Sequence, residues 1–512
     1  MREGSKNPVA QARVSSLPGL PGRLDLSVYG MMPESDVSIH CSKLLTQPLR
    51  CLVLGANGTG MSALCDILLD LGHQVFGLDS NVTNKGAAQV VSSAQIRVDP
   101  WSVDSIPGDI DICVTTPTAE AGNPVVRFVR QQSYPVITLH QCLSILFSAS
   151  RQICVAGTHG KSTTSAMLTS ILDASGLEPG FFVGARMPLL ERSGRAASGL
   201  WSVLESCEFQ ESFRNLQPQI TLLTGIERDH FDYFPSQHSE DEAFLNFARQ
   251  TAADGTIIYS ADCDRSQQLA AQCSQKQISV GLDFERQLRN ADWSASEIRH
   301  HQLTTSFICT GPQGETQVVL SVPGKHNVRN AIFAISAASC VGISPEASAD
   351  ALRFFRGIDR RFQIRGDYGG ILLIDDYAHH PTAIRATLQA VRQSFPGRRI
   401  LLAFEPHQIV RTEALFPDFV ASLSDADESW VLPVFPAREK ATHLDCCRLS
   451  GQLVKELNRC GTKAFLFANL DQVASRVDHS GRPNDILITM GAGMTNLIHD
   501  ELNRRLQRYS VA

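Results

Sequence analysis

The sequence predicts an α/β protein of three domains. Its 512 residues exceed the size at which a single hydrophobic core stops growing. Hydrophobic residues make up 43% and charged residues 19%, which is ordinary for a globular protein. Buried-strand runs followed by turns and helical patterns restart three times, near residues 50, 152 and 370. Each restart predicts a new sheet covered by helices.

Composition excludes several classes of function. The formal net charge of -6 gives no global positive field, which argues against a nucleic-acid binder. The fourteen cysteines are scattered, and the one close pair, Cys446 and Cys447, lacks the C-x-x-C spacing of zinc or redox sites. No run approaches the ~20 apolar residues of a membrane span, and the N-terminus lacks a signal-type apolar region. We therefore expect a reduced, cytoplasmic protein without membrane insertion.

The first domain is expected over residues 48–149. Residues 1–47 carry glycine, proline, serine and isolated charges without periodicity, so we expect a flexible extension there. From Arg50 the pattern becomes a buried strand, a glycine-rich turn, an amphipathic helix and a second strand that ends at Asp79. A further apolar run at 112–115 fits a small parallel sheet.

The glycine-rich turn of this domain is GANGTG, with glycines at Gly55, Gly58 and Gly60. The spacing resembles the dinucleotide fingerprint G-x-G-x-x-G without matching it. The turn suits a diphosphate at a helix N-terminus, and Asp79 at the next strand end suits a sugar or base edge. A purely structural tight turn is the alternative.

The strongest motif opens the second domain. AGTHGKSTT at 156–164 follows an apolar strand and precedes a helical pattern, which is the setting of a phosphate-binding loop. Gly157, Gly160 and Lys161 form a shortened G-x-x-G-K-S. Backbone N–H groups of such a turn bind phosphate oxygens, Lys161 supplies a cation, and the Ser162 hydroxyl can ligate Mg²⁺.

A metal site is expected beside this loop. Glu205 ends the strand WSVLE, Glu208 follows three residues later, and His230 lies in GIERDHFD. Carboxylates at strand ends suit Mg²⁺, whereas a structural, hydrogen-bonded histidine is an equal alternative for His230. Strand patterns over 277–322 predict antiparallel hairpins appended to the second sheet.

The third domain gathers polar side chains at strand ends. DDYAHHPT at 375–382 places two aspartates, His379 and His380 where a strand gives way to a helix. FEPHQIVRT ends another strand with His407 and Arg411, which offer positive charge for a carboxylate or phosphate. Each cluster alone could cap a helix, but together on successive strands they predict a site.

Taken together, these motifs resemble the Mur ligase family of peptidoglycan synthesis. The resemblance runs from about residue 49 to 496. The segments that carry it are GANGTGM (55–61), AGTHGKSTT (156–164), ESCEFQESFRNLQP (205–218), GIERDHFD (225–232), PGKHNVRNA (323–331), DRRF (359–362), DDYAHHPT (375–382), FEPHQIVRT (404–412) and VFPAREK (434–440).

The resemblance implies three functional domains. These are a Rossmann-like UDP-binding domain over 48–149, a central P-loop ATPase domain with a mainly parallel sheet over 150–361, and a C-terminal Rossmann-like α/β domain over 362–512. It also implies ATP-dependent, ADP-forming ligation of L-alanine to the carboxylate of UDP-N-acetylmuramate through an acyl phosphate, with Mg²⁺, in a monomer or homodimer.

The resemblance also assigns roles to individual residues. The nucleotide would be held by Gly157, Thr158, His159, Gly160, Lys161, Ser162 and Thr163, with Asn327 and Asn330 at the adenine and Arg361 at the phosphates. Ser162, Glu205 and His230 would surround Mg²⁺, and Gly58, Gly60 and Asp79 would hold the uridine portion. His380, His407 and Arg411 would frame the amino-acid end, with His230 or His380 as the base.

The sequence departs from the family pattern at three single positions and in the run ESCEFQ (205–210), which is less acidic than usual. Ser162 stands where threonine is usual and keeps the hydroxyl. Gly225 replaces an asparagine and removes a hydrogen-bonding side chain near the metal site. Gln408 replaces an arginine and removes a fixed charge at the amino-acid end.

Two other functions stay open on these residues. The first is a recycling ligase that attaches a preformed peptide to UDP-N-acetylmuramate, because its nucleotide and uridine contacts would be the same. The second is a non-catalytic nucleotide-dependent regulator that retains the fold. The intact polar residues of the site argue against the regulator.

Overall fold

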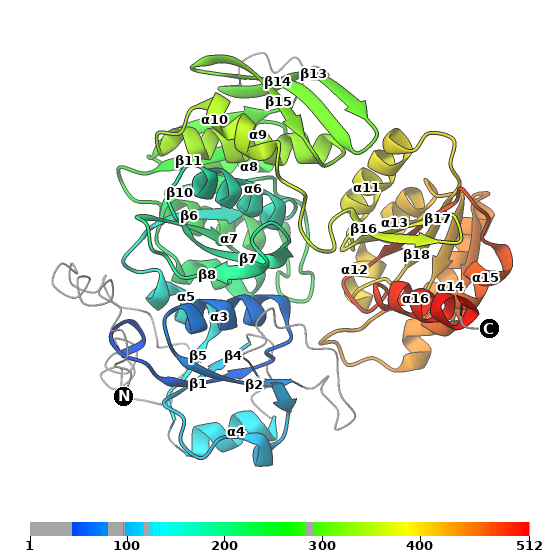
Figure 1. Ribbon diagram of the computed structural model, residues 1–512, viewed down its shortest axis with the longest axis horizontal. Helices are drawn as coiled ribbons and strands as arrows, with labels where there is room; N and C mark the ends of the chain where they lie inside the picture. Colours follow the sequence, from blue (N-terminus) through cyan, green and yellow to red (C-terminus); the bar gives the residue numbers. More distant parts are fainter. Residues whose placement is uncertain are drawn as a thin grey trace.

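The computed structural model describes residues 43–79, 96, 98–116, 123–132, 134–282 and 291–510. These residues form three domains, each built on its own sheet, and the third domain lies beside the central one (Figure 1). Within the described ranges, no helix is long and apolar enough to cross a membrane.

The first domain has a five-stranded parallel sheet in the order β3-β2-β1-β4-β5. Its elements are β1 (Arg50–Leu54), α3 (Thr59–Asp70), β2 (Gln74–Asp79), β3 (Val98–Pro100), η2 (Val103–Ser105), β4 (Ile112–Thr115), α4 (Pro124–Gln131), β5 (Val136–Thr138) and α5 (Leu139–Leu146). The chain crosses from one side of β1 to the other between β3 and β4, so the carboxyl end of β1 is the place where such sheets bind ligands.

The folded part of this domain begins earlier than the sequence indicated. Residues 43–46 are helical, and Leu44 is buried in the same apolar cluster as Leu49. His73 fixes this segment, because its Nε2 lies 3.0 Å from the Leu44 carbonyl oxygen and its Nδ1 accepts the Leu49 N–H. Residues 43–47 therefore belong to the domain rather than to the predicted extension, whose other residues lie outside the described ranges.

The central domain has a ten-stranded sheet in the order β15-β14-β13-β12-β11-β10-β6-β9-β7-β8. Its elements are β6 (Arg151–Ala156), α6 (Lys161–Ala174), β7 (Gly180–Met187), β8 (Arg192–Arg195), β9 (Trp201–Glu205), η3 (Phe209–Asn215), β10 (Pro218–Leu223), α7 (Gln237–Arg249), β11 (Thr256–Ser260), α8 (Asp264–Ala270), β12 (Lys276–Gly281), β13 (Trp293–His301), β14 (Thr304–Gly311), β15 (Gly314–Leu320), α9 (Lys325–Cys340) and α10 (Pro345–Leu352). Helices α6 and α9 pack on one face and share its buried apolar residues.

The prediction of antiparallel hairpins over 277–322 is only partly correct. β12 pairs in parallel with both β11 and β13, so it continues the main sheet. The antiparallel part begins with the pairing of β13 to β14 and continues to β15. An apolar strand looks the same in either pairing direction, so the local pattern could not distinguish them.

The third domain has a six-stranded sheet in the order β16-β17-β21-β18-β19-β20, in which only the edge strand β16 is antiparallel. Its elements are β16 (Gln363–Tyr368), β17 (Ile371–Asp376), α11 (Pro381–Ser394), β18 (Ile400–Phe404), α12 (Ile409–Ala414), α13 (Phe416–Leu423), β19 (Glu428–Val431), α14 (His443–Arg459), β20 (Lys463–Leu466), α15 (Leu470–Ser480), β21 (Ile486–Met490) and α16 (Leu497–Ser510). Helices on both faces bury one apolar cluster each.

The domains are joined in two different ways. Helix α3 of the first domain packs against β7 and β8 (Figure 1). One apolar cluster runs through both domains. Three apolar clusters of the third domain contain only its own buried residues, and the partly buried Leu303 of the central domain packs against one of them. Its contacts with residues 227–232 are polar, which suits a domain that can move.

Candidate active site

The predicted phosphate-binding loop joins β6 to α6. Gly157 and Gly160 have φ angles of 131° and 80°, which favour glycine. A Cβ atom on Gly160 would lie 2.4 Å from Asn330 Oδ1, and one on Gly157 would lie 2.4 Å from Thr224 Oγ1. No described side chain caps α6, so its first N–H groups are left for another acceptor. This glycine-lined helix start fits a phosphate group.

Lys161 is held by a buried carboxylate. Its Nζ donates to Glu208 Oε2 at 2.9 Å and to Oε1 at 3.1 Å, and also to the carbonyl of Gly157 at 2.5 Å. Burial lowers the pKa of Lys161, but the adjacent Glu208 outweighs it and leaves the pKa raised. Burial likewise opposes ionisation of Glu208, and Lys161 still keeps the pKa of this carboxyl below its usual value. Both groups are therefore charged.

The predicted metal ligands divide into two groups. Ser162 Oγ donates to Glu205 Oε1 at 2.9 Å, whereas His230 Nε2 lies 3.4 Å from Glu208 Oε1. His230 Nδ1 is buried and has no hydrogen-bond partner among the described residues, and its φ of 48° is unusual for histidine. Oxygen atoms from the serine and both glutamates form a donor set that suits Mg²⁺.

Glu208, which the sequence analysis named beside Glu205 without assigning it a role, is thus a further functional candidate. The signal was present as a second glutamate three residues after Glu205. Its burial decides its importance, because its side chain is only 2% exposed and touches two candidate residues. The backbone that positions it is irregular, since Gln210 and Glu211 adopt left-handed φ values inside η3.

The predicted adenine contacts lie behind the loop, on α9. Asn330 Oδ1 accepts from Thr164 Oγ1 at 3.3 Å, and its Nδ2 donates to Asn327 Oδ1 at 3.2 Å. Asn327 in turn donates to the carbonyl of Pro323 at 2.7 Å. The guanidinium of Arg361 lies over the Tyr377 ring at 5.2 Å. Contact of these groups with a nucleotide stays a prediction.

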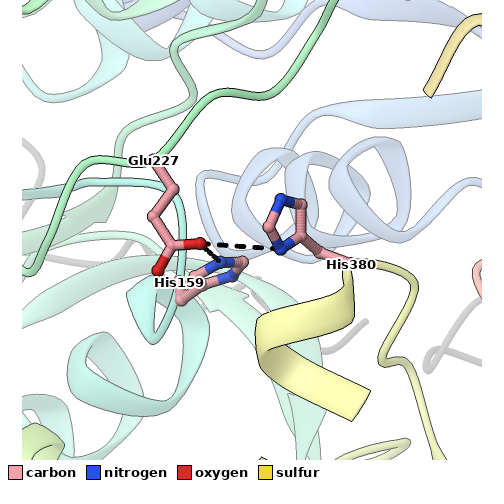
Figure 2. Close-up of side chains that lie close together, drawn as sticks. All are labelled: His159, Glu227 and His380. Atoms are coloured by element: carbon pink, nitrogen blue, oxygen red, sulfur yellow. Dashed lines mark ion pairs between the residues drawn. The ribbon is translucent and has the colours of Figure 1, made fainter. Parts of the chain in front are cut away.

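A first polar bridge links the loop to the third domain. Glu227 pairs with both His159 of the loop and His380, the residue before α11, as Figure 2 shows. Its Oε2 is 3.4 Å from His159 Nε2 and 3.7 Å from His380 Nδ1, and it accepts from Thr382 Oγ1 at 2.6 Å. These residues come from three separate segments, so only the tertiary structure brings them together.

The charges of this bridge are set by burial and by its partners. Burial raises the pKa of Glu227, but the adjacent His159 and the hydrogen bond from Thr382 outweigh it and lower the pKa to about 2. Burial, aided by His159, lowers the pKa of His380 to about 4. Near neutral pH the bridge therefore holds a carboxylate beside a neutral His380. Two imidazoles and a carboxylate can hold a borderline cation, but Thr382 already bonds both Glu227 and His380.

A second bridge involves the predicted amino-acid end. Arg411 Nε and Nη2 contact Asp229 Oδ1 at 2.7 and 2.6 Å, and Nη1 lies 3.0 Å from His407 Nδ1. Burial opposes ionisation of Asp229, but Arg411 keeps its pKa well below the usual range. Burial and Arg411 lower the pKa of His407 to about 3, and the same two causes keep the pKa of His379 well below its usual value. The site therefore holds neutral imidazoles around one buried ion pair.

The predicted uridine site is organised by Asp79. Its Oδ2 accepts the N–H of Asn57 at 2.9 Å and so orients the glycine-rich turn. The Gly58 N–H donates to the carbonyl of Gly55 within that turn. Gly60 lies in α3, where a Cβ would meet Leu139 Cδ2 at 3.2 Å, so its observed role is close packing. Contact of these residues with a ligand stays a prediction.

Comparison with known proteins identifies the family. The Mur ligase family catalytic domain matches residues 52–151, the Mur ligase middle domain matches 155–338, and the glutamate ligase domain of Mur ligases matches 360–493. The chain belongs to the Mur ligase family, which is ATP-dependent. The three-domain α/β architecture predicted from the sequence is confirmed.

Individual relatives span nearly the whole chain. The UDP-N-acetylmuramate–L-alanine ligase of Burkholderia multivorans is 34% identical over 450 residues, which cover 86% of this chain and 94% of the relative. The enzyme of the same name from Agathobacter rectalis is 32% identical and covers 90% of this chain and 99% of its own length.

Two solved structures share the fold. The UDP-N-acetylmuramate–alanine ligase of Thermotoga maritima has a TM-score of 0.75 at 23% identity, with 90% of this chain and 100% of that chain covered. A murein peptide ligase of Psychrobacter arcticus has a TM-score of 0.70, also at 23% identity, with 90% and 98% covered.

Proposed function

We propose that this protein joins L-alanine to the carboxylate of UDP-N-acetylmuramate, with ATP as the phosphoryl donor and Mg²⁺ as the counter-ion. The observation that carries the proposal is that full-length relatives at 30–34% identity bear the name of this activity. The geometry supports it, because the phosphate-binding loop, the oxygen-rich metal candidates and the histidines and arginine of the third domain converge at one interface.

The first half-reaction depends on charge. Mg²⁺ and the γ-phosphate of ATP would supply the counter-charge and the phosphoryl group that activates the muramoyl carboxylate as an acyl phosphate. Lys161 is the first residue of helix α6 and precedes Ser162, which bonds Glu205. From this position its charge can neutralise the transferred phosphoryl group. Its Nζ now contacts Glu208 and the Gly157 carbonyl, so phosphate binding would exchange one of these contacts.

The second half-reaction needs an uncharged amine. His380 is neutral near pH 7 because burial lowers its pKa to about 4. Its Nδ1 accepts the Thr382 N–H, so the neutral ring carries its proton on Nε2 and would orient the acceptor by donating a hydrogen bond. That Nε2 atom is buried and has no hydrogen-bond partner among the described residues. Arg411 and His407 would border the acceptor from the opposite side. Catalysis is then mainly positioning and charge neutralisation.

The test is phosphate release from ATP and Mg²⁺ with UDP-N-acetylmuramate as the donor. Reactions without acceptor are compared with reactions that contain L-alanine, glycine, L-serine or a wall-derived tripeptide. Turnover with L-alanine and formation of the UDP-N-acetylmuramoyl-alanine product support the proposal. If folded protein that binds ATP releases no phosphate with any acceptor, the proposal is contradicted and a non-catalytic regulator is favoured.

A second candidate function is ligation of a preformed peptide. The observation that favours it is Gln408, which provides no positive charge for the carboxylate of a free amino acid. The fold likeness to the murein peptide ligase of Psychrobacter arcticus is compatible with it. Turnover with the tripeptide and none with L-alanine would select this function.

A further inference from the structure

The acceptor end of the site, framed by His380, His407 and Arg411, offers a ligand less positive charge than the sequence indicates. Arg411 is 2% exposed, and its Nε and Nη2 contact Asp229 while its Nη1 contacts both Nδ1 and the carbonyl of His407. Of its five N–H groups, one remains for a ligand. Its charge is also matched by Asp229. An incoming carboxylate therefore needs a second cation.

The neighbouring Gln408 does not supply one. It is 2% exposed, has a φ of 69°, and carries no charge where the family resemblance leads us to expect an arginine. Its backbone N–H donates to the carbonyl of Phe435 at 2.9 Å. This bond fastens the segment before α12 to the loop that contains residues 435–440.

That loop is fixed with respect to Arg411. Glu439 accepts the N–H groups of Ile409, at 2.5 Å, and of Val410, at 3.1 Å, and so caps the start of α12. His407 and Phe435 form a β-bridge, and their rings stack with centroids 5.7 Å apart. These contacts place the loop beside His407 and α12, at the acceptor end of the site.

The loop presents Arg438 to the central domain. Its Nε pairs with Asp232, and its guanidinium lies 3.8 Å above the Phe209 ring. The Phe209 ring also packs against His230, and the centroids of these two rings are 5.2 Å apart. Among the described residues the Nη1 and Nη2 groups of Arg438 have no hydrogen-bond partner, and the side chain is 30% exposed.

The charge of Arg438 also acts on its neighbours in this site. Burial and Arg411 lower the pKa of His407, and Arg438 contributes to the same shift. Burial raises the pKa of Asp232, while Arg438 and also Gln408 outweigh this effect and lower it. Arg438 therefore pairs with Asp232, and its charge also acts on His407.

We propose that Arg438 binds the α-carboxylate of the acceptor amino acid with its free Nη1 and Nη2 groups, and so replaces the positive charge that Gln408 lacks. Its Nε–Asp232 bond holds the guanidinium plane in place, and the Phe209 ring supports it from below. A planar guanidinium with two parallel N–H groups matches a carboxylate, which lysine cannot do equally well. The inference rests on the proposed ligation of an amino acid.

The test compares steady-state kinetics of the full-length wild type with those of Arg438→Gln. The variant is expected to raise the KM for L-alanine about 10- to 100-fold, the range for a lost charged hydrogen bond. The KM values for ATP and UDP-N-acetylmuramate should change less than about twofold. The wild type should also prefer L-alanine to L-alaninamide, and Arg438→Gln should reduce this preference.

Two variants separate carboxylate binding from a structural role. Gln408→Arg in the Arg438→Gln background restores the charge from the adjacent position and should recover most of the affinity for L-alanine. Asp232→Asn removes the partner of Arg438 but keeps the cation, so it should have a much smaller effect on KM. Recovery by the double variant also shows that Arg438→Gln is folded.

The outcomes can be distinguished from failure of the proposed function. A wild type that never uses L-alanine overturns the function itself. A wild type that uses L-alanine, with an Arg438→Gln variant of unchanged KM, overturns only the inference. Equal defects in Asp232→Asn and Arg438→Gln, without recovery on adding Gln408→Arg, would show that Arg438 acts only as a link between domains.

Discussion

Replacement of Glu208 by glutamine tests the charge arrangement around the phosphate-binding loop. Glu208 accepts two contacts from Lys161 Nζ, at 2.9 and 3.1 Å, and lies 3.4 Å from His230 Nε2. Its side chain is 2% exposed and that of Lys161 is 13% exposed. Glu208→Gln keeps the shape and removes the negative charge. Lys161 then remains a buried cation with only carbonyl oxygens as partners.

The expected cost is that of breaking a buried ion pair. Removal of one partner costs about 3–5 kcal/mol, because the remaining charge is uncompensated. For a domain of this size, about 3 kcal/mol lowers Tm by roughly 6–12 °C. The lowered pKa of Glu208 means that its contribution is fully present above the usual value of 4.5 and declines as the pH falls. The Tm values of wild type and variant should therefore converge in acid.

The assay is differential scanning fluorimetry with and without ATP and Mg²⁺, together with phosphate release. Because phosphate can replace the lost carboxylate beside Lys161, nucleotide should raise the Tm of the variant more than that of the wild type. Glu211→Gln is the matched control on the same element, since its pair with Arg214 is exposed and contributes less than about 1 kcal/mol. A Glu208→Gln variant with wild-type Tm and no added response to nucleotide would refute the reasoning.

Three further predictions follow from the same site. Lys161→Ala should abolish phosphate release while calorimetry still detects binding of UDP-N-acetylmuramate, and near-normal turnover would remove Lys161 from the mechanism. Gly160→Ala should weaken ATP binding roughly tenfold or more, since a Cβ there would lie 2.4 Å from Asn330 Oδ1 and the φ is 80°. Titration calorimetry within twofold of wild type would contradict it. His380 has its pKa lowered from 6.5 to about 4, so the folded state binds fewer protons and the protein loses stability as the pH falls between those values. His380→Gln should flatten the dependence of Tm on pH in that window, and an unchanged slope would show that His380 is not the group responsible.

The sequence predicted most of the architecture because its signals are local. The runs before Gly55 and Gly157 contain enough consecutive apolar residues to mark buried parallel strands, and the helices that follow begin at glycine-rich turns. The restart at 370 marked the third sheet for the same reason. Pairing direction is not a local property, and the strand β12 was therefore assigned to a hairpin although it continues the parallel sheet.

The sequence predicted the components of the site less completely than the fold. The phosphate-binding loop could be located because its glycines, lysine and hydroxyls are contiguous. Glu208 could not be ranked above Glu205, because only burial and the contact with Lys161 separate the two glutamates. Arg438 could not be selected either, since its pairing with Asp232 depends on a loop that Glu439 fastens to the start of α12.

The sequence by itself determined that this chain has three α/β domains, a phosphate-binding loop at 156–164 and the residue types of a ligase. These properties depend on neighbouring residues, through strand and helix periodicity and through the backbone freedom of glycine. The tertiary structure decided which of the charged side chains meet. Glu227 contacts His159 within the central domain and His380 of the third domain. Asp229 of the central domain pairs with Arg411 of the third domain. The contacts of Glu227 with Thr382 and of Asp229 with Arg411 join residues more than 150 positions apart, so their identity follows from the packing of the domains and from no local pattern.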